Sequence, residues 1–203
     1  MARIKRIIEK RIILAPRMEM PEFPCFRVDV SNSVGNLIQE FLKIRPNQNW
    51  LLLADYAAQS QQQLWTAWLL SQRAFLQNRA LARSIDAEFL RYIAGTHHVS
   101  EAFRKVGIQD HHKTAWVINL PNYQKSADEL IPDLDAEENL QFIGSLCQKL
   151  SMSIIDGKPE LTIDGLKKLG IEIDKINENT EDILVGLTLS LIHISEPTRR
   201  YRI

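Results

Sequence analysis

Residues 86–108, "DAEFLRYIAGTHHVSEAFRKVGI", predict two short helices separated by a tight turn. Asp86 and Glu88 fall in the first turn of the first helix, where acidic side chains complement the helix dipole. Gly95 is expected to end that helix in the left-handed conformation, which glycine adopts without a steric penalty. A second helix is expected to begin near Val99, so the whole segment reads as a helical hairpin around one glycine.

Two pairs of adjacent histidines raise the question of a metal site. His97 and His98 lie in the turn, and His111 and His112 lie between the second helix and the next expected strand. Adjacent imidazoles point apart unless the backbone bends sharply, and zinc needs three or four ligands at fixed distances. No cysteine-rich or carboxylate-rich motif accompanies the pairs, so we expect no bound metal. A metal-dependent hydrolase that uses these histidines is the enzymatic alternative.

The turn has a second interpretation, as a basic loop at a helix start. Free N–H groups at a helix N-terminus bind anions, and Arg91, Arg104 and Lys105 are close in the sequence. Imidazole and guanidinium planes can also stack on nucleic-acid bases. This pattern predicts a surface for an anionic partner. The structural alternative is that Arg104 and Lys105 only solvate the outer face of a short helix.

Working outward from this segment, hydrophobic periodicity predicts strands and helices in an irregular order. Alternating β-branched or apolar runs predict strands, and stripes of apolar residues three and four positions apart predict helices. The expected strands are 26–30, 49–56 and 113–120. The expected helices are one from Ser31 or Ser33 to Pro46, then 60–77, 136–150, 162–169 and one opening at 179–182. The fold class is therefore mixed α/β (α+β), a single domain with a small central sheet packed with several helices.

Net charge is zero, but the charge is unevenly distributed along the chain. Residues 1–120 carry 16 Lys and Arg against 10 Asp and Glu, whereas residues 121–203 carry 9 against 15. The basic part favours an anionic partner. No apolar run approaches the roughly eighteen residues that a membrane-spanning helix needs, so no membrane association is expected. Cys25 and Cys147 sit among apolar neighbours and read as buried free thiols of a reducing compartment.

Both ends of the chain differ from its middle. Residues 1–25 are basic and then proline-rich, and we interpret them as an N-terminal extension of uncertain start. Residues 189–203 begin with "LSLIHISEPTR", which resembles the in-frame translation of an adapter used to build sequencing libraries. We therefore expect residues 189–203 to be an artefact that interrupts the last helix and adds nothing to the core. The expected domain is 26–188.

Residues 86–108 resemble the kinase-binding subunit of the KEOPS complex, the TPRKB-like family. The resemblance is carried by the acidic helix start, the small-residue turn at Ala94 and Gly95, and the "VSEAFRKVGI" that follows. The segments "WLLLADYAAQSQQQLWTAWLLSQRAF", "AWVINL" and "NENTEDILVGL" are similar to the same family.

The resemblance implies a non-catalytic, cytoplasmic protein without a cofactor. Its partners would be the KEOPS kinase-like subunit and tRNA, held by the 3′ CCA end for threonylcarbamoyladenosine modification. The residues expected to bind tRNA are Arg91, Thr96, His97, His98, Arg104 and Lys105. Those expected to bind the kinase are Ile183, Leu184 and Leu187 of the last helix. A purely protein-binding kinase regulator without RNA contact is the other alternative.

Overall fold

The computed structural model describes residues 21–33, 36–126 and 129–194. Along the chain the elements are β1 (Cys25–Asp29), α2 (Leu37–Ile44), β2 (Trp50–Ala54), the 3-10 helix η1 (Asp55–Ala57), α3 (Gln61–Leu76), α4 (Ile85–Ala94), α5 (Val99–Val106), β3 (Thr114–Asn119), β4 (Asn122–Ser126), β5 (Glu129–Asp133), α6 (Ala136–Leu150), β6 (Ser153–Ile154), α7 (Ile163–Lys168) and α8 (Thr180–Ile194). The mixed α/β fold expected from the sequence is confirmed. Residues 1–20 of the expected extension and 195–203 of the expected tail lie outside the described residues.

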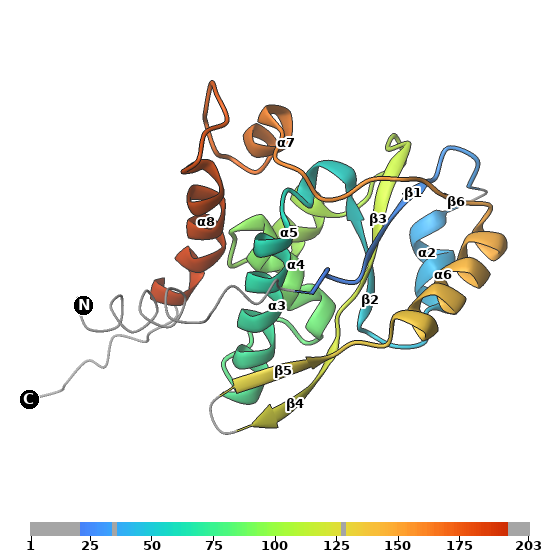
Figure 1. The fold of residues 1–203 in the computed structure, drawn as a ribbon, viewed down its shortest axis with the longest axis horizontal. Coiled ribbons are helices and arrows are strands. Elements are labelled where there is room, and N and C mark those ends of the chain that lie inside the picture. Colours follow the sequence, from blue (N-terminus) through green and yellow to red (C-terminus); the bar gives the residue numbers. More distant parts are fainter. Residues whose placement is uncertain (1–20, 34–35, 127–128, 195–203) are drawn as a thin grey trace, which may run out of the picture.

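The central sheet has the strand order β2-β3-β1-β6, and each neighbouring pair is antiparallel. Successive side chains of a strand point to opposite faces, and β2 uses this alternation to supply two cores. Leu51 and Leu53 join the core under α3, α4 and α8, whereas Trp50 and Leu52 join the core under α2 and α6. The sheet therefore lies between two helical layers (Figure 1).

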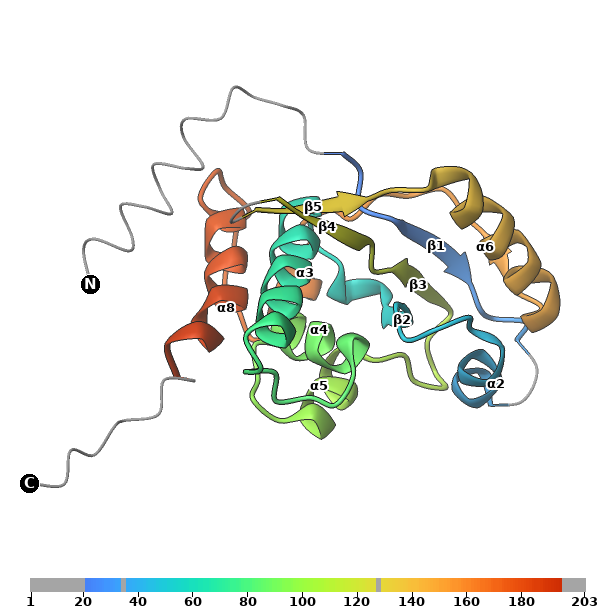
Figure 2. The same ribbon diagram turned by 90° about the horizontal axis from the view of Figure 1, so that it is seen from below.

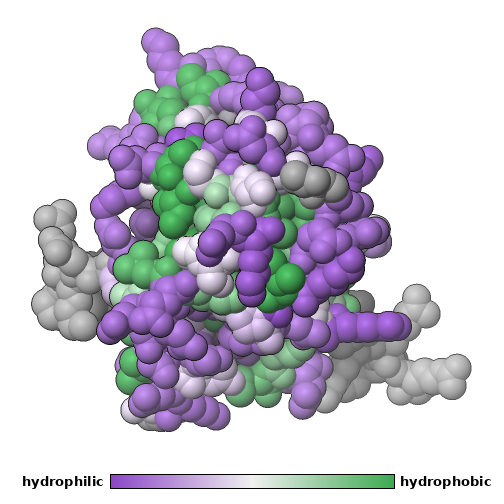
Figure 3. Space-filling view, turned by 90° about the vertical axis from the view of Figure 1, so that its right-hand side faces the viewer, coloured by the Kyte–Doolittle hydropathy of each residue, from purple (hydrophilic) through white to green (hydrophobic). Residues whose placement is uncertain are grey.

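The layer formed by α2 and α6 is the thinner one. Phe41 of α2 and Ile143 of α6 are buried in the core beneath it. Its outer surface is mostly hydrophilic with scattered apolar patches (Figure 3). Leu42 of α2 and Leu140 of α6 contribute exposed apolar side chains.

The opposite layer is built by α3, α4, α5 and α8, and its long helix α3 carries two tryptophans. Trp65 and Trp68 are buried in the core, 7% and 3% exposed, and their indole N–H groups donate to backbone carbonyls. Helix α8 packs against α3 and α4 (Figure 2). Within the described ranges no helix combines the length and apolar character that a membrane crossing requires.

The first helix begins later than the sequence predicts. Ser31 and Ser33 form a turn instead, in which Ser31 N donates to the Asp29 carboxylate and Ser33 N to the Val30 carbonyl. Asn36 caps the helix, since its side chain accepts from Gln39 N. The expected start at Ser31 or Ser33 is therefore wrong, because their backbone N–H groups and the Ser33 hydroxyl, which donates to the Val30 carbonyl, complete a local turn instead of starting a helix.

The hairpin of β4 and β5 is an element that the sequence pattern does not predict. It forms a separate two-stranded sheet, shown in yellow in Figure 1. Tyr123 and Leu130 pack its inner side against the larger core, while Ile131 is 49% exposed. Its strands are short and rich in polar residues, so their alternation is weak in the sequence.

Candidate functional site

The turn between α4 and α5 lies against α8. Gly95 adopts the left-handed conformation with φ 63°, as expected, and its N–H bonds the carbonyl of Tyr92. A Cβ added at Gly95 would stand 2.6 Å from Cδ1 of Leu187. Glycine is thus required here twice, by the backbone conformation and by the close approach of α8. The two sites predicted separately, the turn and the last helix, are in contact.

Arg91 has a structural role in the turn. Its side chain and that of Glu88 are only 2% and 1% exposed, and they form an ion pair of 2.6 Å between Nη1 and Oε1. Arg91 Nε also donates to the His97 carbonyl at 3.1 Å, which fixes the turn. The guanidinium is therefore enclosed and held within the fold, and the tRNA contact expected of Arg91 stays a prediction.

Thr96 is also taken up by the turn. It is buried, its hydroxyl donates to the Glu101 carboxylate at 2.6 Å, and it accepts from His98 N. This hydrogen bond is the main reason why the pKa of Glu101 is lowered, with smaller contributions from nearby positive charges. Thr96 therefore holds the start of α5 and is withdrawn from the expected binding surface.

Lys105 ties α5 to the end of α4. Its Nζ donates to the Ala94 carbonyl at 2.8 Å, one of the carbonyls that helix α4 leaves without an internal partner. Burial lowers the pKa of Lys105, and the Glu101 carboxylate opposes that shift. The ammonium is thus bound within the fold, and the role of Lys105 in tRNA binding stays a prediction.

Of the residues expected to bind tRNA, His98 and Arg104 are exposed. His97 is half-buried, and its Nε2 atom is enclosed without a hydrogen-bond partner in the described part of the chain. The structure therefore brings the predicted residues together, but for most of them the polar atoms face inward.

The second histidine pair lies beside a different part of the fold. His112 Nδ1 accepts from Gln109 N at 3.1 Å, and its ring meets Tyr56 edge to face. Burial lowers the pKa of His112, and the neighbouring His111 and Lys168 lower it further. Among the described residues, no three His, Cys, Asp or Glu side chains form a group that could hold a metal ion.

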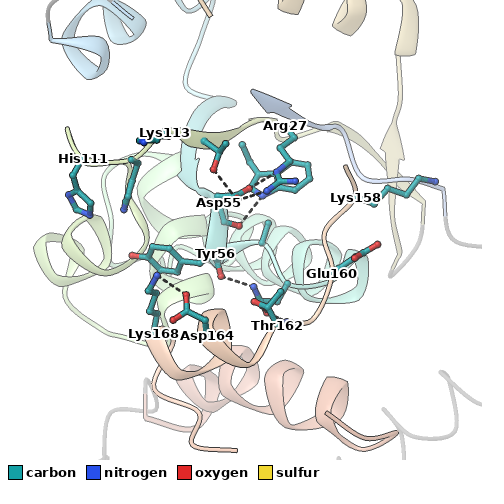
Figure 4. Close-up of a pocket in the computed structure, with 15 residues that line it drawn as sticks. Arg27, Asp55, Tyr56, His111, Lys113, Lys158, Glu160, Thr162, Asp164 and Lys168 are labelled. Carbon is teal, nitrogen blue, oxygen red and sulfur yellow. Dashed lines mark hydrogen bonds and ion pairs between the residues drawn. The ribbon is translucent and has the colours of Figure 1, made fainter. Parts of the chain in front are cut away.

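His111 and His112 border a polar cleft of about 480 Å³ that the sequence does not reveal. Figure 4 shows side chains from β1, η1, α7 and the start of β3 converging on it. Arg27 binds Asp55 through two hydrogen bonds of 2.8 and 2.6 Å. Lys168 pairs with Asp164 and lies 4.7 Å from the centre of the Tyr56 ring. The cleft thus offers charges that are mostly paired with one another, and its residues are too far apart in sequence to form a motif.

Helix α8 contributes its inner face to the core of this same chain. Leu184 is fully buried and Leu187 packs partly against the same core, so the kinase contact expected of these two leucines stays a prediction. Ile183 is 48% exposed on the outer face. The helix continues to Ile194, and Leu191 is 4% exposed within the core. The expectation that residues 189–203 add nothing to the core is therefore wrong at Leu191.

Gly186 also lies on the outer face of α8. A Cβ added there would meet nothing within 4 Å. Glycine inside a helix costs about 1 kcal/mol relative to alanine, and no neighbour among the described residues explains its use here. The outer face of α8 thus combines an exposed isoleucine with an open backbone.

Comparison with known proteins gives one family. The profile of the family described as kinase binding protein CGI-121 matches residues 28–185, more than half of the chain. No curated protein matches the sequence.

Proposed function

Because the chain belongs to the family of CGI-121 kinase binding proteins, we propose that it is a non-catalytic KEOPS subunit that binds the kinase-like subunit and recruits tRNA. The family match carries the kinase-binding part. The resemblance of residues 86–108 supports the finer assignment: a cytoplasmic subunit that holds the tRNA 3′ CCA end during threonylcarbamoyladenosine synthesis.

The outer face of α8 is the proposed kinase-binding surface. Ile183 offers exposed apolar area there, and Gly186 lets a partner approach the helix backbone closely. An apolar helix face set into a groove is a common recognition mode. Leu184 and Leu187 act indirectly, because their burial fixes the helix on α3 and α4.

The proposed tRNA contacts are reduced to His98 and Arg104, which are exposed next to the turn. Arginine pairs with phosphates, and imidazole and guanidinium planes stack on unpaired bases. The turn touches α8 through Gly95 and Leu187, so RNA contact and kinase contact would lie on adjacent surfaces. This adjacency supports a subunit that presents RNA to a complex.

A matched pair of glycine variants tests the kinase surface. Gly186 of α8 and Gly144 of α6 are both helical glycines whose added Cβ would meet nothing within 4 Å. Gly186→Arg is expected to weaken binding of the kinase-like subunit by about tenfold or more, corresponding to roughly 1.4 kcal/mol, measured by calorimetry. Gly144→Arg should bind as the parent does. Equal affinity of all three proteins would remove the outer face of α8 from the interface.

The RNA contact is tested on tRNA with and without its CCA end. His98→Ala/Arg104→Ala should weaken binding only to the complete tRNA, with Arg73→Ala of α3 as the exposed control. Losing the one phosphate contact of Arg104 should reduce the salt slope by about 0.7. Full affinity of the double variant, with no effect of CCA removal, would favour a kinase regulator without RNA contact.

A further inference from the structure

An apolar groove of about 580 Å³ runs along the free edge of the central sheet, far in sequence from α8. Its floor is formed by Leu51 and Leu52 of β2, which is the edge strand opposite β6. Figure 2 shows β2 between α2 on one side and α4 and α5 on the other. The groove therefore lies between the two helical layers, where the sheet ends.

The hydrogen-bond pattern of β2 leaves backbone groups pointing into this groove. The backbone N–H of Asn119, the residue paired with Trp50, donates to the Pro24 carbonyl and therefore points away from β2. The Trp50 carbonyl correspondingly accepts from Arg45 Nη1 at 2.9 Å, outside the ladder with β3. Because outward groups recur at every second residue of an antiparallel strand, the N–H and C=O of Leu52 face the same open edge.

These groups lie in an apolar setting. Leu52 is 8% exposed, and a buried peptide group without a hydrogen bond is costly to desolvate. Exposed apolar side chains form both walls: Leu42 of α2 on one side, and Leu81 and Phe103 on the other. A strand paired to Leu52 would satisfy the backbone and cover both walls at once.

The charges that line the groove favour an acidic end on that strand. Asp86 neutralises Arg45 through an ion pair of 2.6 Å near the Trp50 end of β2. Arg83 also lines the groove, is exposed and has no ion-pair partner in the described part of the chain. An antiparallel partner strand would bring its C-terminal end to the Trp50 end of β2, beside Asp86, which follows Arg83 by three residues.

We infer that this groove binds an extended segment of a partner protein, which adds as an antiparallel strand to β2. The segment is apolar on both faces, as strands buried on both sides are, and carries an acidic residue at its C-terminal end. The lining shares no residue with the proposed kinase and tRNA contacts, although Val99 and Phe103 adjoin His98 and Arg104 in the sequence.

The probe is a synthetic peptide, acetyl-Ser-Thr-Val-Ile-Val-Asp-Asp-amide, titrated into the full chain and followed by NMR amide exchange. Exchange at Leu52 should slow by about tenfold or more on binding, while Leu51 and Leu53, whose amides already pair with β3, should change little. A peptide with N-methylated Val and Ile amides should not pair with β2 and so should not protect Leu52, because it cannot donate to the Leu52 carbonyl and its methyl groups crowd the strand edge. Equal binding of both peptides without protection of Leu52, or no binding of either, would overturn strand addition.

Side-chain variants locate the site. Phe103→Asp should lower the affinity for the peptide by about tenfold. Leu140→Asp, at an exposed apolar position of α6 outside the groove lining, should leave that affinity unchanged. Arg83→Glu should lower the affinity for the acidic peptide but not for a peptide in which Ser-Ser replaces the terminal Asp-Asp. A Phe103→Asp protein that binds as tightly as the parent would place the peptide elsewhere.

Discussion

Replacing Arg91 by alanine should destabilise the fold without acting specifically on RNA binding. The substitution leaves the Glu88 carboxylate, 1% exposed, without its cation. Removing one partner of a buried ion pair costs about 3–5 kcal/mol. Glu88 still accepts from the backbone N–H groups of Leu81 and Ala82, at 3.2 and 2.8 Å, so the lower end of about 3 kcal/mol applies.

Urea and thermal unfolding measure this loss. About 3 kcal/mol corresponds to a Tm lower by roughly 6–12 °C for a domain of this size. Arg104→Ala, at an exposed position, should stay within about 0.5 kcal/mol of the parent. Adding Glu88→Gln to Arg91→Ala removes the unpaired charge. The double variant should regain about 1–2 kcal/mol of the free energy of unfolding relative to Arg91→Ala, which measures the coupling between the two residues.

The reasoning fails if Arg91→Ala unfolds within about 1 kcal/mol of the parent, as a surface substitution does. It also fails if that variant keeps its stability but loses tRNA affinity. Either result would mean that the guanidinium leaves its pocket and reaches solvent.

Other substitutions probe the core and the thiol. Leu191→Ala should cost about 2–5 kcal/mol in urea unfolding, because the side chain is 4% exposed in the core, and an unchanged midpoint would separate the end of α8 from the core. Gly95→Ala should cost more than about 1 kcal/mol, since φ is 63° and the new methyl group would meet Leu187 at 2.6 Å; a neutral effect would show that α8 yields. Burial raises the pKa of Cys25 to about 12, so at pH 8 only about one thiol in ten thousand is thiolate. Iodoacetamide should therefore modify native Cys25 about a thousandfold more slowly than a free cysteine, faster as pH rises, and rapid labelling in the folded state would contradict this.

Local signals in the sequence predict the parts of the fold that short-range geometry controls. Gly95 ends α4 as expected, and Asp135 caps α6 by accepting from Glu138 N at 2.8 Å. Both depend on residues within one helical turn. The α4–α5 hairpin and the strand at residues 114–119 follow from the same kind of pattern.

The candidate site depends on burial, which sequence proximity does not determine. Arg91 and Lys105 are near the turn in sequence, but their polar groups turn inward to Glu88 and Ala94. The open edge of β2 could not be predicted either. Its exposure follows from the order of strands in the sheet, and no residue in β2 marks it as an edge strand.

The packing of α8 on α3 also has a consequence for the growing chain on the ribosome. Leu64 belongs to the same core as Leu184 of α8, which is added 120 residues later. At roughly 5–20 residues per second, synthesis of that interval takes about 6–24 seconds. During this time the apolar face of α3 is already made while the helix that covers it has not yet been synthesised. The uncovered apolar surface favours aggregation of the nascent chain until α8 is made.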